Sequence, residues 1–150
     1  MNFFHVAGPL GRTYILKFLV GEPLVKGLVQ FAAHADIGGS TLEAIGAVRD
    51  AEIGWFDTEA LTYRTRTFPE TLELVSLMGT LARDEENQPV VHAHVCLAGR
   101  DLEPWAGHLV EAECAVTVEV ILREIGMDLR RRKDETFGLK LLHFPGTEEA

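Results

Sequence analysis

The amino-acid sequence predicts an α+β fold: a mostly antiparallel sheet of about seven strands with one main helix near the N-terminus. Three observations predict this class. One early segment, residues 24–35, combines helical spacing of apolar residues with helix boundary signals. Most other segments are rich in β-branched and aromatic residues, and short turns connect them, as between antiparallel strands. The 150 residues suit a single domain with one core.

The first elements are a strand and a helix. Residues 13–20 are rich in β-branched and aromatic side chains and predict a strand. Pro23 is well placed just before a helix start, and the Gly38-Gly39 pair ends the helical pattern of residues 24–35. The apolar residues that recur at helical spacing, and that we expect to be buried, are Leu24, Leu28 and Phe31.

The rest of the chain has mainly the composition of strands. Two short strands are expected on either side of Asp50. Segment 71–81 also fits a helix, but its β-branched residues and Gly79 favour a strand. The strands expected after the helix, in chain order, cover residues 41–48, 52–56, 61–68, 71–81, 90–97, 108–125 and 138–144.

Composition excludes several classes of protein. Apolar residues make up 47% and charged residues 25%, which excludes global disorder. The net charge of −9 disfavours general coating of nucleic acid, because an acidic protein repels phosphate unless its cations are gathered in one place. Cys96 and Cys114 have no CxxC spacing and give neither a disulfide framework nor a zinc ribbon. No uncharged apolar stretch approaches the ~20 residues of a membrane span, so we expect a cytoplasmic protein without a membrane partner.

Three histidines form the candidate site. His92 and His94 are two residues apart on one predicted strand, so both imidazoles leave the same face, roughly 6–7 Å apart along the chain. His108 follows a turn, and an antiparallel return would bring it beside this pair. Three neutral imidazoles are a standard ligand set for Zn²⁺, with a fourth position for water or substrate. Because neutral imidazole is needed, metal affinity should fall below about pH 6.5.

Other readings of these residues stay open. A His-x-His pair on a strand can be no more than a polar stripe. Cys96 shares the face of the pair, as a further ligand or as a small buried apolar group. The carboxylates considered as catalytic acids are Glu43, Glu111, Glu113 and Glu119; on a regular strand the last three face away from His108, and a bulge would change that.

The run Arg130-Arg131-Arg132-Lys133 is the strong basic patch of the sequence. It fits a solvated turn or a set of salt-bridge donors, and the sharper interpretation is a contact with nucleic acid or another polyanion. No aromatic residues alternate with these cations, which argues against base stacking.

Several motifs together resemble the plant-and-prokaryote-conserved (PPC) domain family. The central one is VVHAHVCLAGRDLEPWAGHL, a His-x-His strand followed by a GHL element. The segments GSTLEAIGAVRDAEIGWFD, YRTRTFPETLELVSLMGTL and LRRRKDETFGLKLL resemble further motifs of that family and of its bacterial members. The similarity covers about residues 12–142, which we take as the domain core. Where the family usually has a second glycine before GHL, this chain has Ala106, a departure that bears on the local backbone geometry.

The resemblance implies a mixed α+β fold that assembles as a homotrimer. Plant members carry a separate AT-hook for DNA, and this sequence has no RGRP-type AT-hook. The family fold is also similar to that of acetolactate decarboxylase, in which a His-x-His pair and a later histidine hold a catalytic zinc. Here the matching positions are His92, His94 and His108. At the contacts between copies we expect some of the rings of Trp55, Phe56 and Trp105.

Two functions of different classes follow. The first is a trimeric assembly or regulatory module with a three-histidine site for zinc or another divalent transition metal, associated at most weakly with DNA. The alternative is a zinc-dependent hydrolase or lyase that acts on a small molecule. An open coordination position in a pocket with an adjacent acid would favour the enzyme.

Overall fold

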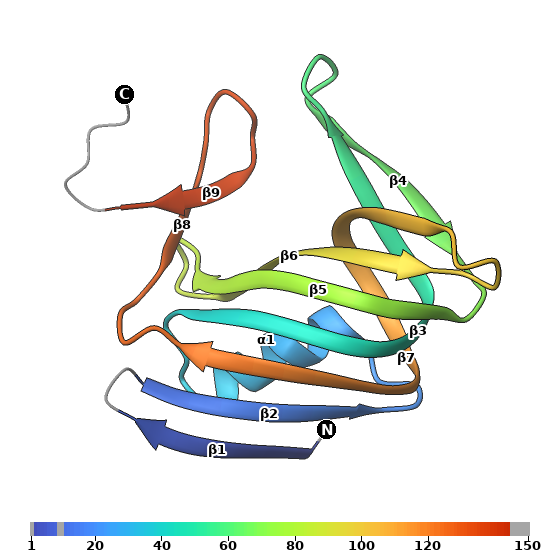
Figure 1. The fold of residues 1–150 in the computed structure, drawn as a ribbon. Coiled ribbons are helices and arrows are strands. Elements are labelled where there is room, and N and C mark those ends of the chain that lie inside the picture. Colours follow the sequence, from blue (N-terminus) through green and yellow to red (C-terminus); the bar gives the residue numbers. More distant parts are fainter. Residues whose placement is uncertain (1, 9–10, 145–150) are drawn as a thin grey trace.

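The fold of the described residues, 2–8 and 11–144 of the computed structural model, is one sheet with a single helix packed against it (Figure 1). The predicted α+β class is confirmed, and all pairings but β5–β8 are antiparallel. The elements are β1 (Asn2–Gly8), β2 (Gly11–Leu19), α1 (Leu24–His34), β3 (Ser40–Asp57), β4 (Thr62–Phe68), β5 (Leu72–Arg83), β6 (Pro89–Ala98), β7 (Pro104–Glu124), β8 (Arg130–Lys133) and β9 (Lys140–His143).

The strand order differs from the chain order. Along the main path it is β1-β2-β7-β3-β5-β8-β9, while β4 pairs with β3. Strand β6 pairs with β5 on one side and with the first part of β7 on the other. Since β3 also pairs with both β5 and β7, these four strands hydrogen-bond in a closed circuit. This circuit brings β6 and the start of β7, which carry the three histidines, side by side.

The two longest strands are irregular. The two short strands expected around Asp50 form one continuous strand, β3, and Asp50 takes a left-handed conformation with φ 48° where the pairing with β7 shifts. Farther along, β7 advances two residues, from Leu109 to Glu111, while β3 moves by one. This bulge breaks the alternation of faces in β7, so the expected opposite orientation of His108 and the later glutamates does not hold for the whole strand.

Helix α1 packs on one face of the sheet with the predicted stripe. Leu24, Leu28 and Phe31 are all buried in the main core cluster. The approach to β2 is close at Gly27, where a Cβ atom would lie 2.5 Å from the Phe18 ring. With 11 residues, α1 is too short to cross a bilayer, and the described part of the chain has no other helix that could.

The N-terminus of α1 is capped by a residue from β7 rather than by its own first residues. Pro23 occupies the N-cap position and provides no side-chain cap. Instead, the Glu111 carboxylate accepts hydrogen bonds from the backbone N–H groups of Val25 (2.7 Å) and Lys26 (3.0 Å) and from its neighbour Ala112 (2.9 Å). A carboxylate at this position satisfies unpaired N–H groups and complements the positive end of the helix dipole.

Three further elements differ from the expected strands. β1 was not predicted, and it forms an antiparallel edge with β2. The basic run is not a turn but the short strand β8, which pairs with β9 and touches β5 at one position. The expected last strand, 138–144, is shorter than predicted, at Lys140–His143.

Candidate metal centre

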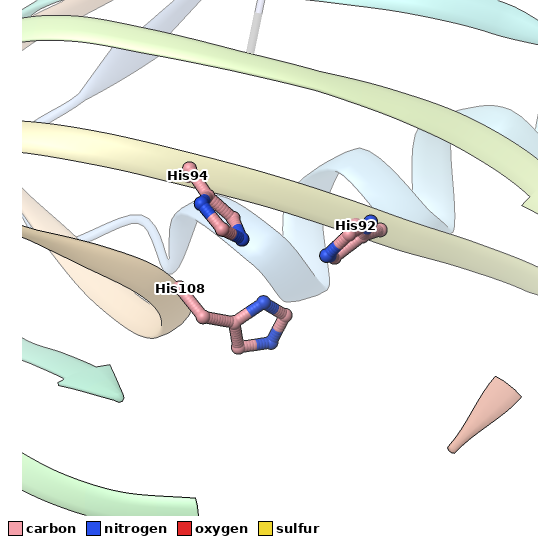
Figure 2. Close-up of side chains that lie close together, drawn as sticks. All are labelled: His92, His94 and His108. Atoms are coloured by element: carbon pink, nitrogen blue, oxygen red, sulfur yellow. The ribbon is translucent and has the colours of Figure 1, made fainter. Parts of the chain in front are cut away.

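The three predicted histidines lie together on two paired strands. His94 on β6 is the direct cross-strand neighbour of His108 on β7, and His92 is two residues earlier on β6. The ring centroids are 5.3 Å apart for His92–His94, 5.2 Å for His92–His108 and 5.7 Å for His94–His108. Figure 2 shows one ring nitrogen of each residue directed toward the space between the rings. The antiparallel return predicted from the turn is therefore present.

The donor atoms are suited to one transition-metal ion. One ligand atom from each histidine lies within 4.8 Å of the other two. A tetrahedral zinc ion with bonds of ~2.0–2.1 Å holds its nitrogens about 3.4 Å apart, so small ring rotations would close the group. The Nδ1 atom of His108 is buried and has no hydrogen-bond partner among the described residues. Such an unpaired buried nitrogen is costly, and a metal ion would accept its lone pair.

Two side chains from other strands contact this group. The ring of Tyr63 on β4 stacks on His108, with centroids 4.8 Å apart at 28°. From β8, the Arg131 guanidinium places Nη2 3.2 Å from His92 Nδ1. An arginine can only donate, so Nδ1 is the acceptor in this contact and the neutral ring carries its proton on Nε2. To bind a metal through Nε2, the ring has to move that proton to Nδ1.

The surroundings of His92 and His108 favour the neutral form of both rings. Burial, followed by the nearby charge of Arg131, lowers the pKa of His92 to about 4. Burial is also the main cause that lowers the pKa of His108, with His94 and Arg131 adding to it. Neutral imidazoles are the form that binds metal. For His92 and His108, protons therefore compete with the metal only below the value of about pH 6.5 that the sequence predicts.

Two cavities flank the ring of His108, and Tyr63 borders both. One, of about 190 Å³, extends along His92, Arg131 and Lys140. The other, of about 370 Å³, is lined on the side of His94 by Trp55 and Phe56. A ligand can thus reach the histidines from a cationic side and from an aromatic side.

The other candidate ligands and acids are engaged elsewhere. Cys96, half-buried on β6, is not part of the metal-ligating group found among the described residues. Glu111 caps α1, and Glu113 forms an ion pair with Arg49. Glu43 pairs with Arg123 at 2.8 Å on the exposed side of the sheet, and Glu119 lines a cavity there.

The basic run does not present four cations to solvent. Arg131 is only 4% exposed, and its guanidinium also donates to the carbonyl of Lys140 and to Thr80 Oγ1. Arg130 pairs with Asp128 and with Asn87. The sequence analysis predicts Arg131 to be part of a surface patch, because nothing in four consecutive basic residues indicates which one faces inward. Tyr63 was likewise recognised only as a strand residue.

Comparison with known proteins decides the family. The family model of the Plants and Prokaryotes Conserved (PCC) domain, the PPC domain of the sequence analysis, matches residues 5–126. The chain belongs to this family. Within β7 of this PPC protein, Ala106 lies opposite Cys96 and is not among the residues with positive φ, so the missing glycine causes no strain there. Arg131 lies beyond the matched residues.

Solved structures of proteins from several organisms share the fold of this PPC protein. A PPC protein of Pyrococcus horikoshii is 30% identical with a TM-score of 0.83, and 97% of each chain is covered. A metal-containing protein of Archaeoglobus fulgidus is 33% identical with a TM-score of 0.80, covering 96% of this chain and 99% of the other. A "putative dna binding protein" of Bacteroides thetaiotaomicron, 22% identical over 95% and 97% of the chains, has a TM-score of 0.86 and shows the fold alone. No curated protein matches the chain.

Proposed function

We propose that this PPC protein binds zinc, or another divalent transition metal, through His92, His94 and His108 and acts as a trimeric assembly or regulatory module. The observation that carries the metal site is the convergence of three ring nitrogens within 4.8 Å, one of them buried without a partner. The metal-containing relative of Archaeoglobus fulgidus supports the same assignment. Bound zinc would supply a Lewis acid with one coordination position left open.

Elemental analysis tests the metal site. After purification with added zinc, the wild type should hold about one ion per chain, as expected for a three-imidazole set. The double variant His92→Ala/His94→Ala should lose it. His34→Ala is a matched control, because His34 is exposed at the end of α1 and far from the group in the sequence. Equal metal content in the wild type and the double variant would show that the ion binds elsewhere.

The outer face of the sheet supports assembly. Ile15, Ile45 and Met78 are 50%, 59% and 68% exposed on β2, β3 and β5, and they border a largely apolar hollow of about 410 Å³. The alternating residues of these strands, such as Leu16, are buried on the side of α1. Contiguous exposed apolar surface of this kind is typical of protein–protein contacts. Trp105, by contrast, packs within the chain against Phe68.

Light scattering tests the trimer. The wild type should have a mass near three times 16.6 kDa. The substitution Met78→Glu places a charge on the outer face and should lower the mass toward that of one chain. Leu102→Glu, at a residue that is 76% exposed in a turn, should leave the mass unchanged. A wild type that is monomeric at micromolar concentration would refute the trimer, and an unchanged Met78→Glu mass would exclude this face.

Weak DNA association is the remaining part of this proposal. The basic run leaves Arg132 and Lys133 as its exposed cations, since Arg131 is buried. We expect sequence-independent binding that falls steeply with added salt, because phosphate contacts release counterions. Fluorescence anisotropy with duplex DNA at about 150 mM salt measures it. Submicromolar, sequence-selective binding would contradict this expectation.

The second candidate function is a zinc-dependent hydrolase or lyase. The cavities on both sides of His108 favour it, because they give a small molecule access to the open coordination position. Among the described residues no carboxylate lines either cavity, so the adjacent acid that would favour an enzyme is missing there. Tyr63 is the ionisable hydroxyl that lines both cavities. The enzyme would be established if the zinc-loaded wild type converts a small-molecule substrate to product and the variant His92→Ala/His94→Ala does not.

A further inference from the structure

On the cationic side of the centre, Lys140 is paired with Asp84, but Arg131 has no carboxylate partner among the described residues. Arg131 is 4% exposed, and its guanidinium contacts two neutral oxygens and an imidazole nitrogen. Among residues 11–144 no carboxylate lies within 4.0 Å of it, although other arginines of the chain form such pairs. Its Nε atom is buried without a partner in the same part of the chain. Burying an unpaired charge is costly, and arginine stays protonated even when burial lowers its pKa.

Metal binding makes this imbalance larger. A divalent ion held by three neutral imidazoles adds two positive charges next to Arg131, and neither cavity is lined by an acidic side chain in the described residues. The contact between Arg131 and His92 also changes. Once Nε2 of His92 binds a metal, the proton of the neutral ring is on Nδ1, and two donors then face each other across 3.2 Å. A hydrogen-bond acceptor with negative charge would satisfy both donors.

The cavities limit what kind of anion fits. The cationic cavity measures about 190 Å³, room for a small group only. A guanidinium is planar and matches a carboxylate through two parallel hydrogen bonds. The second cavity, of about 370 Å³, shares Tyr63 and His108 with the first and offers the rings of Trp55 and Phe56. Trp55 is 64% exposed, an unusual position for so large an apolar ring.

We propose that the metal-loaded centre binds a small organic carboxylate, whose charge is neutralised by Arg131 together with the metal and whose apolar part occupies the cavity lined by Trp55 and Phe56. This inference rests on the proposed metal site and names the class of its ligand. It assigns to Arg131 the role of a ligand-binding residue, and to Trp55 that of a residue selecting for an apolar or aromatic group. Because charge neutralisation is mutual, carboxylate and metal should each strengthen the binding of the other.

Calorimetry of the zinc-loaded protein tests the ligand class. Phenylacetate should bind, whereas its neutral counterpart phenylacetamide should bind about tenfold to a hundredfold more weakly, the value of a hydrogen bond to a charged group. Acetate tests binding of the carboxylate group alone. The substitution Trp55→Ala should weaken the binding of phenylacetate and leave the binding of acetate unchanged. Equal affinity for the amide, or tighter binding of inorganic phosphate than of either carboxylate, would overturn the proposed class.

Variants of two neighbouring arginines test the residue. Arg131→Met removes the charge and keeps an apolar stem, and it should weaken phenylacetate by a similar factor while zinc content stays near one ion per chain. Arg130→Met is the matched control, because Arg130 points its charge toward Asp128 at the surface. Unchanged phenylacetate binding in Arg131→Met would refute the assignment.

A linkage measurement needs no variant and separates the two proposals. Zinc affinity of the wild type should rise in the presence of phenylacetate by the same factor as zinc raises phenylacetate affinity. A protein that takes up no zinc would contradict the metal site itself. A protein that takes up zinc with an affinity independent of phenylacetate would contradict only the carboxylate site.

Discussion

Removing the carboxylate of Glu111 should destabilise the protein without affecting its metal site. The carboxylate accepts hydrogen bonds from Val25, Lys26 and Ala112, and it is the cap that α1 lacks from its own sequence. Loss of a helix cap costs about 1 kcal/mol, and loss of a negative charge at a helix N-terminus costs about 0.3–1 kcal/mol more. Because the Glu111 carboxylate accepts three backbone N–H bonds, we expect Glu111→Ala to cost near the upper end of this sum, about 2 kcal/mol.

Thermal and urea unfolding at one protein concentration measure this cost. For a chain of this size, about 2 kcal/mol lowers Tm by about 4–8 °C. Glu111→Gln keeps an oxygen acceptor and should lose about half as much. Glu73→Ala on β5 is a matched control, exposed on a strand, and should change stability by less than about 0.5 kcal/mol. Unchanged stability together with lost zinc binding or turnover would refute the capping role and restore Glu111 as a candidate acid.

Two further predictions concern the titration of His92 and the contact of Gly27 in α1 with Phe18. His92 has a pKa near 4 in the folded, metal-free protein, below its ordinary value, so the unfolded chain binds a proton first as pH falls. Stability should therefore decrease from about pH 6.5 to about pH 4, by up to about 3 kcal/mol, and urea unfolding of His92→Gln should show a shallower decrease. Gly27→Ala brings a methyl group against the buried Phe18 ring and should cost about 1–3 kcal/mol of unfolding free energy despite the better helix propensity of alanine. A stabilised Gly27→Ala would mean that the ring moves freely.

Sequence patterns predicted the parts of the site that depend on local geometry. Alternation along a strand placed His92 and His94 on one face, and a short turn returned His108 beside them; both expectations agree with the pairing of His94 and His108. The helix stripe at Leu24, Leu28 and Phe31 was likewise predicted, because periodicity alone determines it.

The parts that depend on distant strands could not be predicted. The inward position of Arg131 follows from the pairing of β8 with β9 and from the β5 contact, neither of which leaves a trace in a run of four basic residues. The role of Glu111 depends on a bulge in β7 that changes the facing of the strand, and on a helix 85 residues earlier in the sequence. Single sequences do not specify register between such elements.

The central position of β7 has a consequence for how the protein folds. β7 lies between β2 and β3 in the sheet, yet it comes after both in the chain and ends at Glu124. During synthesis, the helix and the first strands are therefore made well before the strand that holds them together. Pairing over such sequence separations is slow because the closing loops are long, so we expect refolding over milliseconds to seconds rather than microseconds. The histidine cluster, completed by His108 at the start of β7, should form in this same late step.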